Sequence, residues 1–175
     1  MKETQKMIRG YVFGGVRVLL IFPSLIWTVT ALADYVLRIP ITGNSSLRWI
    51  IVIFLLVSGF AFGITSIVYQ NIAGKGGPLE ISNIEISPKT RNLVITGPYR
   101  YCRNPMLFGT FLIYFALALV INSLTAVILV ALLAAFMLMV VVKLEEARLL
   151  QDFGDQYRQY RRKTSKIIPW FPERE

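Results

Sequence analysis

Four long runs of apolar residues dominate the chain, and shorter polar segments separate them. The runs cover Tyr11 to Ala33, Trp49 to Tyr69, Met106 to Ile121 and Leu124 to Val142. A helix needs about 20 apolar residues to cross the ~30 Å hydrocarbon core of a bilayer. Most of the runs approach that length, although the third is short. The pattern predicts an all-α integral membrane protein with about four transmembrane helices.

The polar breaks between the runs differ in kind. Only Asn122 and Ser123 separate the third run from the fourth, which predicts a tight helical hairpin with its turn at or just inside the membrane interface. Residues 71–98 instead hold four Gly and three Pro, so a continuous helix is not expected there. Within them, the GKGGP motif predicts a flexible turn, and Asn92 to Thr96 predicts an extended piece. Pro23, inside the first run, is expected to kink that helix.

Residues 143–175 read KLEEARLLQDFGDQYRQYRRKTSKIIPWFPERE and are far more polar than the runs. Leu149, Phe153, Tyr157 and Tyr160 recur at helical spacing among charged residues, which predicts an amphipathic helix lying along the membrane face. Gly154 is expected to break or bend this helix. The whole chain, residues 1–175, is interpreted as one membrane domain. Its parts are a two-span scaffold (1–70), a cytoplasmic loop with a motif (71–105), a helical hairpin (106–142) and a cytoplasmic tail (143–175).

Composition and charge agree with a membrane protein and predict its orientation. The chain is 55% hydrophobic and carries a net charge of +9. Lys and Arg gather in the N-terminal tail, in residues 71–105 and from Lys143 onward, whereas the segments placed outside hold only Arg38 and Arg48. Because basic residues accumulate on the cytoplasmic side, we expect a multi-pass protein of a prokaryotic plasma membrane with both termini in the cytoplasm. The same asymmetry disfavours a nucleic-acid partner.

The N-terminal sequence also resembles a signal peptide, because MKETQKMIR precedes an apolar run that ends in Ala31-Leu32-Ala33. The run exceeds the ~7 to 15 residues of a signal h-region, so an uncleaved first span is expected. Cys102 is the single cysteine, and the sequence has no histidine. An internal disulfide, a Cys/His zinc site and a Ser-His or Cys-His nucleophile are thereby excluded, and no metal is expected.

The stretch TGPYRYCRNPMLFG, residues 96–109, places charged and aromatic residues directly before the third run. Asn104 and Pro105 predict the start of that helix, since Asn is a favoured N-cap and Pro a favoured first residue. A helix N-terminus carries a partial positive charge, and Arg103 adds a full charge beside it. The predicted hairpin brings Glu145 and Glu146 to the same depth. Because adjacent helical residues point ~100° apart, we expect one glutamate to face a ligand and the other to pair with an arginine or reach water.

The order GPYRYCRNPM, an apolar hairpin and then EEARLLQDFGDQYRQYRRKTSKIIP resembles a family of integral-membrane methyltransferases. That family includes isoprenylcysteine carboxyl methyltransferase and the phospholipid N-methyltransferases. The resemblance covers roughly residues 74–169 and implies that S-adenosylmethionine binds between the cytoplasmic end of the hairpin and the C-terminal tail. It implies that the following residues line or support the pocket: Gly97, Pro98, Tyr99, Arg100, Tyr101, Arg103, Asn104, Pro105, Glu145 and Glu146.

The resemblance also suggests roles for individual residues. The helix start at Asn104 and Pro105, with Arg103, would bind the methionyl carboxylate, and a glutamate of the pair would bind the ammonium or the ribose hydroxyls. Tyr99, Tyr101 or Tyr157 would pack against adenine or the sulfonium. The candidate catalytic residues are Arg103, Asn104, Glu145 and Glu146.

One position departs from the family pattern. Many members have His where this chain has Asn104, and an amide cannot carry a proton. The acceptor is expected to be a membrane-resident, lipid-like molecule, either a carboxylate of the isoprenylcysteine type or a phospholipid amine. The lack of histidine slightly favours an acceptor that ionises readily, although Glu145 or Glu146 could accept a proton from an amine.

Three other classes of protein were weighed. A non-enzymatic tetraspan scaffold or assembly protein would use the same charged residues only to anchor helix ends. A nicotinamide-dependent lipid reductase is a further alternative, since membrane sterol reductases resemble this C-terminal architecture. A small transporter is disfavoured because the spans place no acidic residue at the membrane midplane. Gly59 and Gly63 form a small-xxx-small pair that is expected to serve internal helix packing rather than dimerisation.

Overall fold

The fold is given by a computed structural model, which describes residues 2–75, 80–81, 84–85 and 90–170. Helices make up most of these residues. In chain order the elements are α1 (Lys2–Val16), η1 (Arg17–Ile21), α2 (Phe22–Val36), α3 (Ser45–Gly74), β1 (Glu80–Ile81), β2 (Ile84–Glu85), η2 (Gly97–Arg100), α4 (Pro105–Ile121), α5 (Leu124–Phe136), η3 (Met137–Val141) and α6 (Val142–Lys163).

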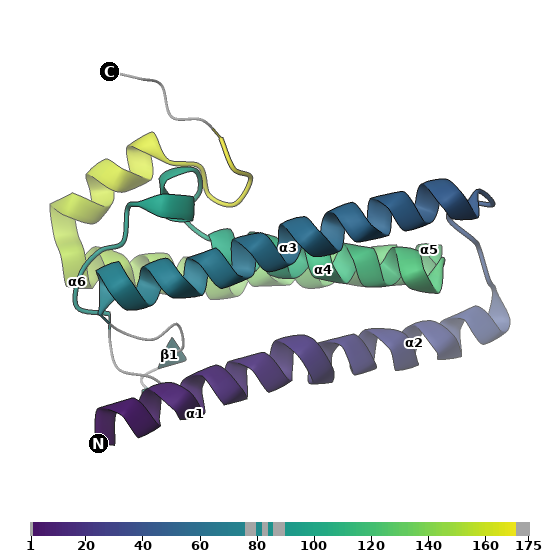
Figure 1. Cartoon of the computed structure of the whole chain (residues 1–175), viewed down its shortest axis with the longest axis horizontal. Coiled ribbons are helices and arrows are strands. Elements are labelled where there is room, and N and C mark those ends of the chain that lie inside the picture. Colours follow the sequence, from purple (N-terminus) through teal and green to yellow (C-terminus); the bar gives the residue numbers. More distant parts are fainter. Residues whose placement is uncertain (1, 76–79, 82–83, 86–89, 171–175) are drawn as a thin grey trace.

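Three of the described helices are long and apolar enough to cross a membrane. They cover Ile8–Val36, Ser45–Gly74 and Leu124–Lys163, and the shorter apolar helix Pro105–Ile121 accompanies them. The predicted helical membrane architecture is thereby confirmed in outline. Figure 1 shows the α1–α2 helix along one side of the molecule, with α3, α4 and α5 running beside one another.

The first long helix is interrupted by one π-helical turn, η1, which ends one residue before Phe22. Pro23 explains where this irregularity falls. In a π turn the Val18 carbonyl would accept from residue 23, and proline has no N–H to donate. The Tyr114 hydroxyl of α4 donates to that carbonyl instead, at 2.9 Å. Pro23 was expected to kink this helix; the structure has a π turn directly before Phe22 and Pro23, and the Tyr114 hydrogen bond joins this turn to the core.

Close contact between α3 and α4 depends on glycine. A Cβ built on Gly59 would lie 2.8 Å from the Gly109 carbonyl oxygen, and a Cβ on Gly109 would lie 2.6 Å from the Gly59 oxygen. One turn away, the rings of Phe62 and Phe108 meet edge to face with centroids 5.0 Å apart. Gly59 thus serves internal helix packing, as the small-xxx-small pattern predicts.

The predicted hairpin between the third and fourth runs is confirmed. Asn122 ends α4 in the left-handed conformation with φ of 55°, which reverses the chain, and α5 starts two residues later. The Asn122 side chain also holds the connection between α2 and α3, because its Oδ1 accepts from the N–H groups of Ile41 and Thr42, both at 3.2 Å. The Leu124 N–H donates to the Ile39 carbonyl at 2.9 Å. The two connections at this end of the molecule are therefore fixed to each other.

The segment between α3 and α4 contains little regular structure. β1 and β2 pair antiparallel, with Glu80 opposite Glu85. Asn92 to Thr96, expected to be extended, form no strand, and Val94 among them is buried. The last three residues of the GKGGP motif lie outside the described residues, and Lys75 ends α3 with φ of 52°.

The C-terminal helix α6 continues from α5 through the π turn η3 and then bends. Gly154 has φ of 52° and ψ of −122°, a non-helical conformation, and so confirms the predicted bend. Figure 1 shows the N-terminus and α6 at one end of the molecule, and the α2–α3 and α4–α5 connections at the other. The segments expected to be cytoplasmic thus share one end.

Candidate functional site

The stretch of residues 96–109 that leads into α4, here called the motif, is held by contacts from two other helices, α3 and α6. Gly97 has φ of 60°, and a Cβ there would lie 2.5 Å from the Tyr69 ring of α3, so only glycine fits. The hydroxyl of Tyr99 donates to Gln70 Oε1 at 3.2 Å. The Tyr160 hydroxyl of α6 donates to the Tyr99 carbonyl at 2.6 Å. The turn η2 therefore links the end of α3 to α6.

Arg103 is the most connected side chain of the motif. Its Nε and Nη2 donate to Glu146 Oε1 at 3.2 and 2.8 Å, and only 10% of its side chain and 11% of that of Glu146 are exposed. Its Nη1 donates to the carbonyl oxygens of Arg161, at 3.0 Å, and of Thr164. Because the Arg103 guanidinium donates to a carboxylate and to two backbone carbonyl oxygens at once, it holds α6 and the residues after it in place against the motif.

Residues 161–170, here called the closing segment, run back across the motif. The Arg103 N–H donates to the Ser165 carbonyl at 2.9 Å, and the Trp170 N–H donates to the Tyr101 carbonyl at 3.0 Å. The Ser165 hydroxyl also donates to the Tyr101 carbonyl, at 3.1 Å. The motif and the closing segment are therefore joined mainly through their backbones.

Asn104 corrects one expectation. It occupies the N-cap position, and its carbonyl accepts from the Phe108 N–H at 3.0 Å, yet its side chain makes no capping hydrogen bond. The Asn104 amide instead donates to the Lys166 carbonyl at 2.8 Å. Because the Asn104 side chain is hydrogen-bonded to the closing segment, α4 begins without a side-chain acceptor for its first N–H groups.

The two glutamates differ, as their helical spacing predicts. Glu146 pairs with Arg103, and Arg161 Nε lies 3.9 Å from its second oxygen. Glu145 is 43% exposed and lies 4.0 Å from Arg148, a long contact on the same helix. Among the described residues, Glu145 therefore offers a carboxylate that no close partner occupies.

Tyr157 comes from the part of α6 that follows the Gly154 bend, and it is fully buried. Its hydroxyl has no hydrogen-bond partner among the described residues. A buried hydroxyl without a partner costs about 1–3 kcal/mol relative to a satisfied one. Such an atom is typical of a place that a ligand or a water molecule completes.

Cys102 lies inside this assembly and is inert. Its side chain is fully buried, and burial raises the pKa of the thiol to about 11, although the Asn104 backbone and the Arg103 charge act in the opposite direction. Reactive cysteines need a thiolate near neutral pH. Cys102 therefore packs and does not act as a nucleophile.

The structure brings together most of the residues singled out from sequence. Arg103, Asn104, Glu146 and Tyr101 meet one another or the closing segment, Gly97 and Pro98 support the motif from η2, and Pro105 is buried as the first residue of α4. Arg100 is exposed and takes part in none of the hydrogen bonds described above. Among the described residues, no group of three or more Asp, Glu or Cys side chains is placed to hold a metal ion.

The resemblance implied that the C-terminal tail would lie beside the motif, but sequence reasoning did not identify the individual contacts of the closing segment, Tyr160 or Gln70. Most of these contacts use backbone carbonyls of Arg161, Thr164, Ser165 and Lys166. A carbonyl oxygen occurs at every residue and leaves no mark in a sequence pattern. Only the family resemblance indicated that this region would meet the motif.

The fold and this site define a helical protein with long apolar helices. At one end, Arg103 lies beside Glu145 and Glu146, and these three residues are here called the corner. The phospholipid methyltransferase family matches residues 47–156, more than half of the chain, so the chain belongs to that family. The matched residues include α3, the motif, the hairpin and Glu146.

Two curated relatives are similar to the chain. Methanethiol S-methyltransferase 1 of Bradyrhizobium diazoefficiens is 26% identical over 167 residues, which are 90% of this chain and 52% of the relative. Methanethiol S-methyltransferase of Mycobacterium tuberculosis is 35% identical over 72 residues, which are 41% of this chain and 28% of the relative. The chain thus spans about half the length, or less, of the curated relatives it matches. The expected relationship to membrane methyltransferases is confirmed.

Proposed function

We propose that the chain transfers a methyl group from S-adenosylmethionine to a lipophilic acceptor at the corner formed by Arg103, Glu145 and Glu146. One observation carries the proposal. In a chain of the phospholipid methyltransferase family, the motif, the hairpin end and the closing segment interlock beside a carboxylate, Glu145, that remains available. A methyltransferase needs such a corner mainly to hold its donor in position.

The residues present fit a zwitterionic donor. The start of α4 has no side-chain cap, so its first N–H groups suit the methionyl carboxylate. Glu145 suits the ammonium group or the ribose hydroxyls, and the unpartnered Tyr157 hydroxyl suits a polar atom of the nucleoside. When bound, S-adenosylmethionine supplies an electrophilic methyl group on its sulfonium. Tyr99 and Tyr101 are the further aromatic candidates for contact with it.

The contacts of Arg103 and Asn104 narrow their proposed roles. Nε and both Nη atoms of Arg103 already donate to Glu146 and to the closing segment, and the Asn104 amide donates to Lys166. We therefore assign both residues to positioning: they fix the α4 start and the closing segment on which the donor would rest. Glu146 shares that role, because Arg103 occupies its carboxylate.

In this proposal, Glu145 is the base that would accept a proton from the methyl acceptor. The chain has no histidine, and an asparagine amide cannot act as a base. An acceptor that is already anionic needs no base, whereas an ammonium must first lose a proton. Glu145 is the carboxylate at the corner that is free to receive it.

The acceptor is proposed to reach the corner from the bilayer. A lipid-like carboxylate or amine is the first candidate, since the apolar helices place the corner at the end of a hydrophobic surface. A small thiol is the second candidate, and the observation that favours it is the name of both curated relatives, methanethiol S-methyltransferase.

The proposed topology places four spans in the membrane with the N-terminal and C-terminal segments in the cytoplasm. Three helices have sufficient length, and α4 has 17 residues. At 1.5 Å per residue α4 reaches roughly 25 Å, so it serves as a fourth span only where the bilayer thins or the helix ends are interfacial. The bend at Gly154 lets the second part of α6 leave the α5 direction and lie along the interface.

The test uses the full chain purified in detergent. Calorimetry with S-adenosylmethionine should show saturable binding, and Glu145→Gln should weaken it on the order of tenfold, because it removes one charged contact. Asp152→Asn, an exposed acid on the same helix, is the matched control and should bind normally. Incubation with methyl-labelled donor, in parallel with total membrane lipid and with methanethiol, then identifies the acceptor.

Three results would contradict the proposal. The first is no binding of S-adenosylmethionine by the folded chain, as a scaffold protein would show. The second is saturable binding of a nicotinamide cofactor instead, as a lipid reductase would show. The third is normal donor binding by Glu145→Gln.

A further inference from the structure

A cavity lies at the opposite end of the molecule from Arg103. It has a volume of about 520 Å³ and lies between the end of α2 and the end of α4, where Val120 and Ile121 line it. The length of α4, roughly 25 Å at 1.5 Å per residue, separates this cavity from the methyl-transfer corner. The cavity is therefore a different site, and its function does not depend on the proposed reaction.

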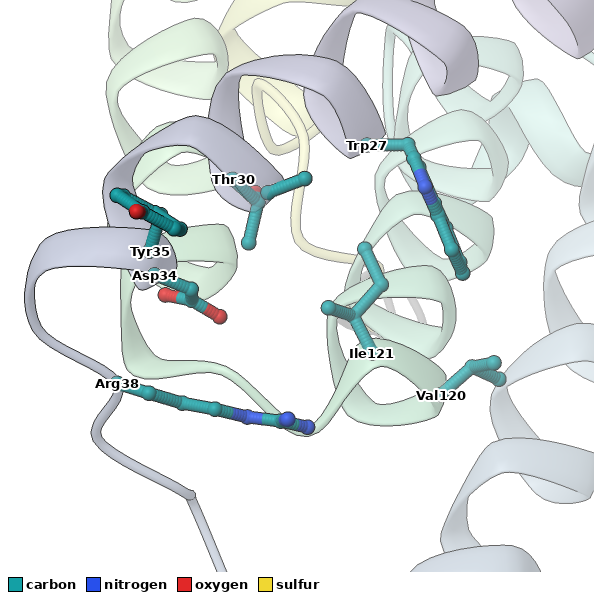
Figure 2. Close-up of a pocket in the computed structure, with 8 residues that line it drawn as sticks. Trp27, Thr30, Asp34, Tyr35, Arg38, Val120 and Ile121 are labelled. Atoms are coloured by element: carbon teal, nitrogen blue, oxygen red, sulfur yellow. The ribbon is translucent and has the colours of Figure 1, made fainter.

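Two opposite charges line this cavity without meeting each other. Asp34 comes from the last turn of α2, and Arg38 follows the helix end at Val36. Within the described part of the chain Arg38 forms no ion pair, and Asp34 Oδ1 accepts only from the Ser123 hydroxyl, at 2.8 Å. Figure 2 shows the Asp34 carboxylate and the extended Arg38 side chain bordering the same opening. A ligand that carries both a positive and a negative group complements this arrangement.

A buried hydroxyl gives an independent sign of a ligand. Thr30 also lines the cavity, is fully buried, and its Oγ1 has no hydrogen-bond partner among the described residues. Figure 2 shows Thr30 on the same helix as Asp34, across the opening from Ile121. An unsatisfied buried hydroxyl is costly, so a polar atom within the cavity would remove a real penalty.

The frame of the cavity is preorganised. Asn122 holds the residues that follow Arg38 through the N–H groups of Ile41 and Thr42, and Ser123 holds Asp34. Because the connections on both sides are already fixed, binding of a ligand would require little further ordering of the protein. The entropic cost of binding would therefore be small.

The outer surface around the cavity is apolar and aromatic. Trp27 and Tyr35 line it and are 55% and 91% exposed, and Leu32 beside them is 70% exposed. Tyr35 lies at the end of this membrane-crossing helix, where Tyr typically marks the level of lipid headgroups, and Trp27 lies about two turns deeper along the same helix. A ligand here would thus have its polar part in the cavity and an apolar part against α2.

We propose that this cavity binds the headgroup of a zwitterionic aminophospholipid from the leaflet opposite the methyl-transfer corner. Arg38 would bind the phosphate, Asp34 the primary ammonium, and the Thr30 hydroxyl an ester oxygen. The acyl chains would lie along α2 beside Trp27. This lipid is a bound structural partner and not the methyl acceptor.

The experiment measures lipid binding by native mass spectrometry of the full chain released from mild detergent. The lipids are phosphatidylethanolamine, phosphatidylglycerol and phosphatidylcholine with the same acyl chains, added one at a time. Wild type should bind phosphatidylethanolamine most tightly. Arg38→Gln should weaken binding of all three on the order of tenfold, because the phosphate contact is common to them. Asp34→Asn should remove the preference for phosphatidylethanolamine over phosphatidylglycerol.

The matched control is Arg48→Gln, which removes a cation at the same end of the molecule but outside the cavity. It should bind lipid as wild type does. Arg38 contacts no other described side chain through an ion pair, so its variant should fold, which the thermal midpoint checks.

Several outcomes would overturn the proposal. They are equal binding by Arg38→Gln and wild type, an equal loss in Arg48→Gln, or no preference among the three lipids. Binding of soluble glycerophosphoethanolamine as tightly as the diacyl lipid would overturn the lipid assignment and point to a soluble phosphate ester. Binding of S-adenosylmethionine, tested in the same variants, should not change. The two proposals therefore fail or succeed separately.

Discussion

Arg103 and Glu146, 43 residues apart in sequence, share two hydrogen bonds to a single carboxylate oxygen, at 3.2 and 2.8 Å. The pair joins the start of α4 to α6. Because both side chains are about 90% shielded from solvent, little screening weakens the pair, and each charge depends on the other.

Removing Arg103 should therefore destabilise the fold strongly. Arg103→Ala leaves Glu146 buried without its main partner, and the expected loss is about 3–5 kcal/mol in the free energy of unfolding. Arg158→Ala is the matched control, since its pair with Asp155 is 66% and 83% exposed and contributes about 0.5 kcal/mol. Unfolding in mixed detergent micelles measures both. Similar losses in the two variants would contradict a special role for the buried pair.

Substitution of the glycines between α3 and α4 should separate the helices. Gly59→Ala places a Cβ 2.8 Å from the Gly109 carbonyl oxygen, which is backbone and cannot turn aside. We expect a loss of about 1–3 kcal/mol from overpacking. A Cβ on Gly63 meets nothing within 4 Å, so Gly63→Ala should be neutral or slightly stabilising. The same unfolding measurement decides between them.

Alanine substitutions at Gly97 and Gly154 should distinguish the cost of a strained backbone from the cost of a steric clash. Both have positive φ, 60° and 52°, but only a Cβ on Gly97 would strike another group, the ring of Tyr69. Gly154→Ala should cost about 1–3 kcal/mol from its backbone conformation alone. Gly97→Ala should cost more, and it should also weaken donor binding because η2 supports the site. Equal effects of the two substitutions on stability would show that Tyr69 moves without penalty.

Tyr157 and Tyr160 should respond in opposite ways to loss of a hydroxyl. Tyr157→Phe removes a buried hydroxyl without a partner and should leave stability unchanged or raise it by about 1 kcal/mol, while weakening S-adenosylmethionine binding. Tyr160→Phe removes a donor to the Tyr99 carbonyl and should lower stability by about 1 kcal/mol. A stability loss in Tyr157→Phe would mean that its hydroxyl already has a partner in the protein.

The buried thiol of Cys102 should make the stability of the protein depend on pH in the alkaline range. The thiol deprotonates near 9.0 in the unfolded chain and at a pKa of about 11 in the folded chain, where burial disfavours the thiolate. A pKa raised by folding gives a stability contribution that is present below pH 9 and lost as the pH rises to 11. The difference in thermal midpoint between wild type and Cys102→Ala should therefore shrink across that range. Maleimide should label the native protein slowly at pH 7 and the unfolded protein rapidly.

The elements of this fold could be predicted well where their cause is local. The apolar runs, the turn at Asn122 and Ser123 and the bend at Gly154 follow from hydropathy and backbone preference within a few residues. The split between Glu145 and Glu146 followed from helical geometry alone. In contrast, the hydrogen bond from the Tyr114 hydroxyl to the Val18 carbonyl in the π turn joins residues 96 positions apart, which no local pattern contains.

The site could be predicted only in part for a related reason. Asn104 was a good N-cap candidate by residue type, yet its amide binds Lys166 because the closing segment passes directly beside it. Competition between two nearby acceptors is decided by tertiary position and not by propensity. The cavity at Asp34 and Arg38 was equally hidden, since two charges at the end of a span look like ordinary boundary residues.

The backbone contacts between the closing segment and Tyr101 and Arg103 have a consequence for biosynthesis. A ribosome that has delivered α4 and α5 to the membrane has not yet made residues 161–170. Until those residues emerge, the Arg103 guanidinium lacks the carbonyl groups of Arg161 and Thr164, and the proposed donor site is incomplete. A nascent chain halted in α6 would thus carry its apolar helices without the contacts that fix residues 101–104.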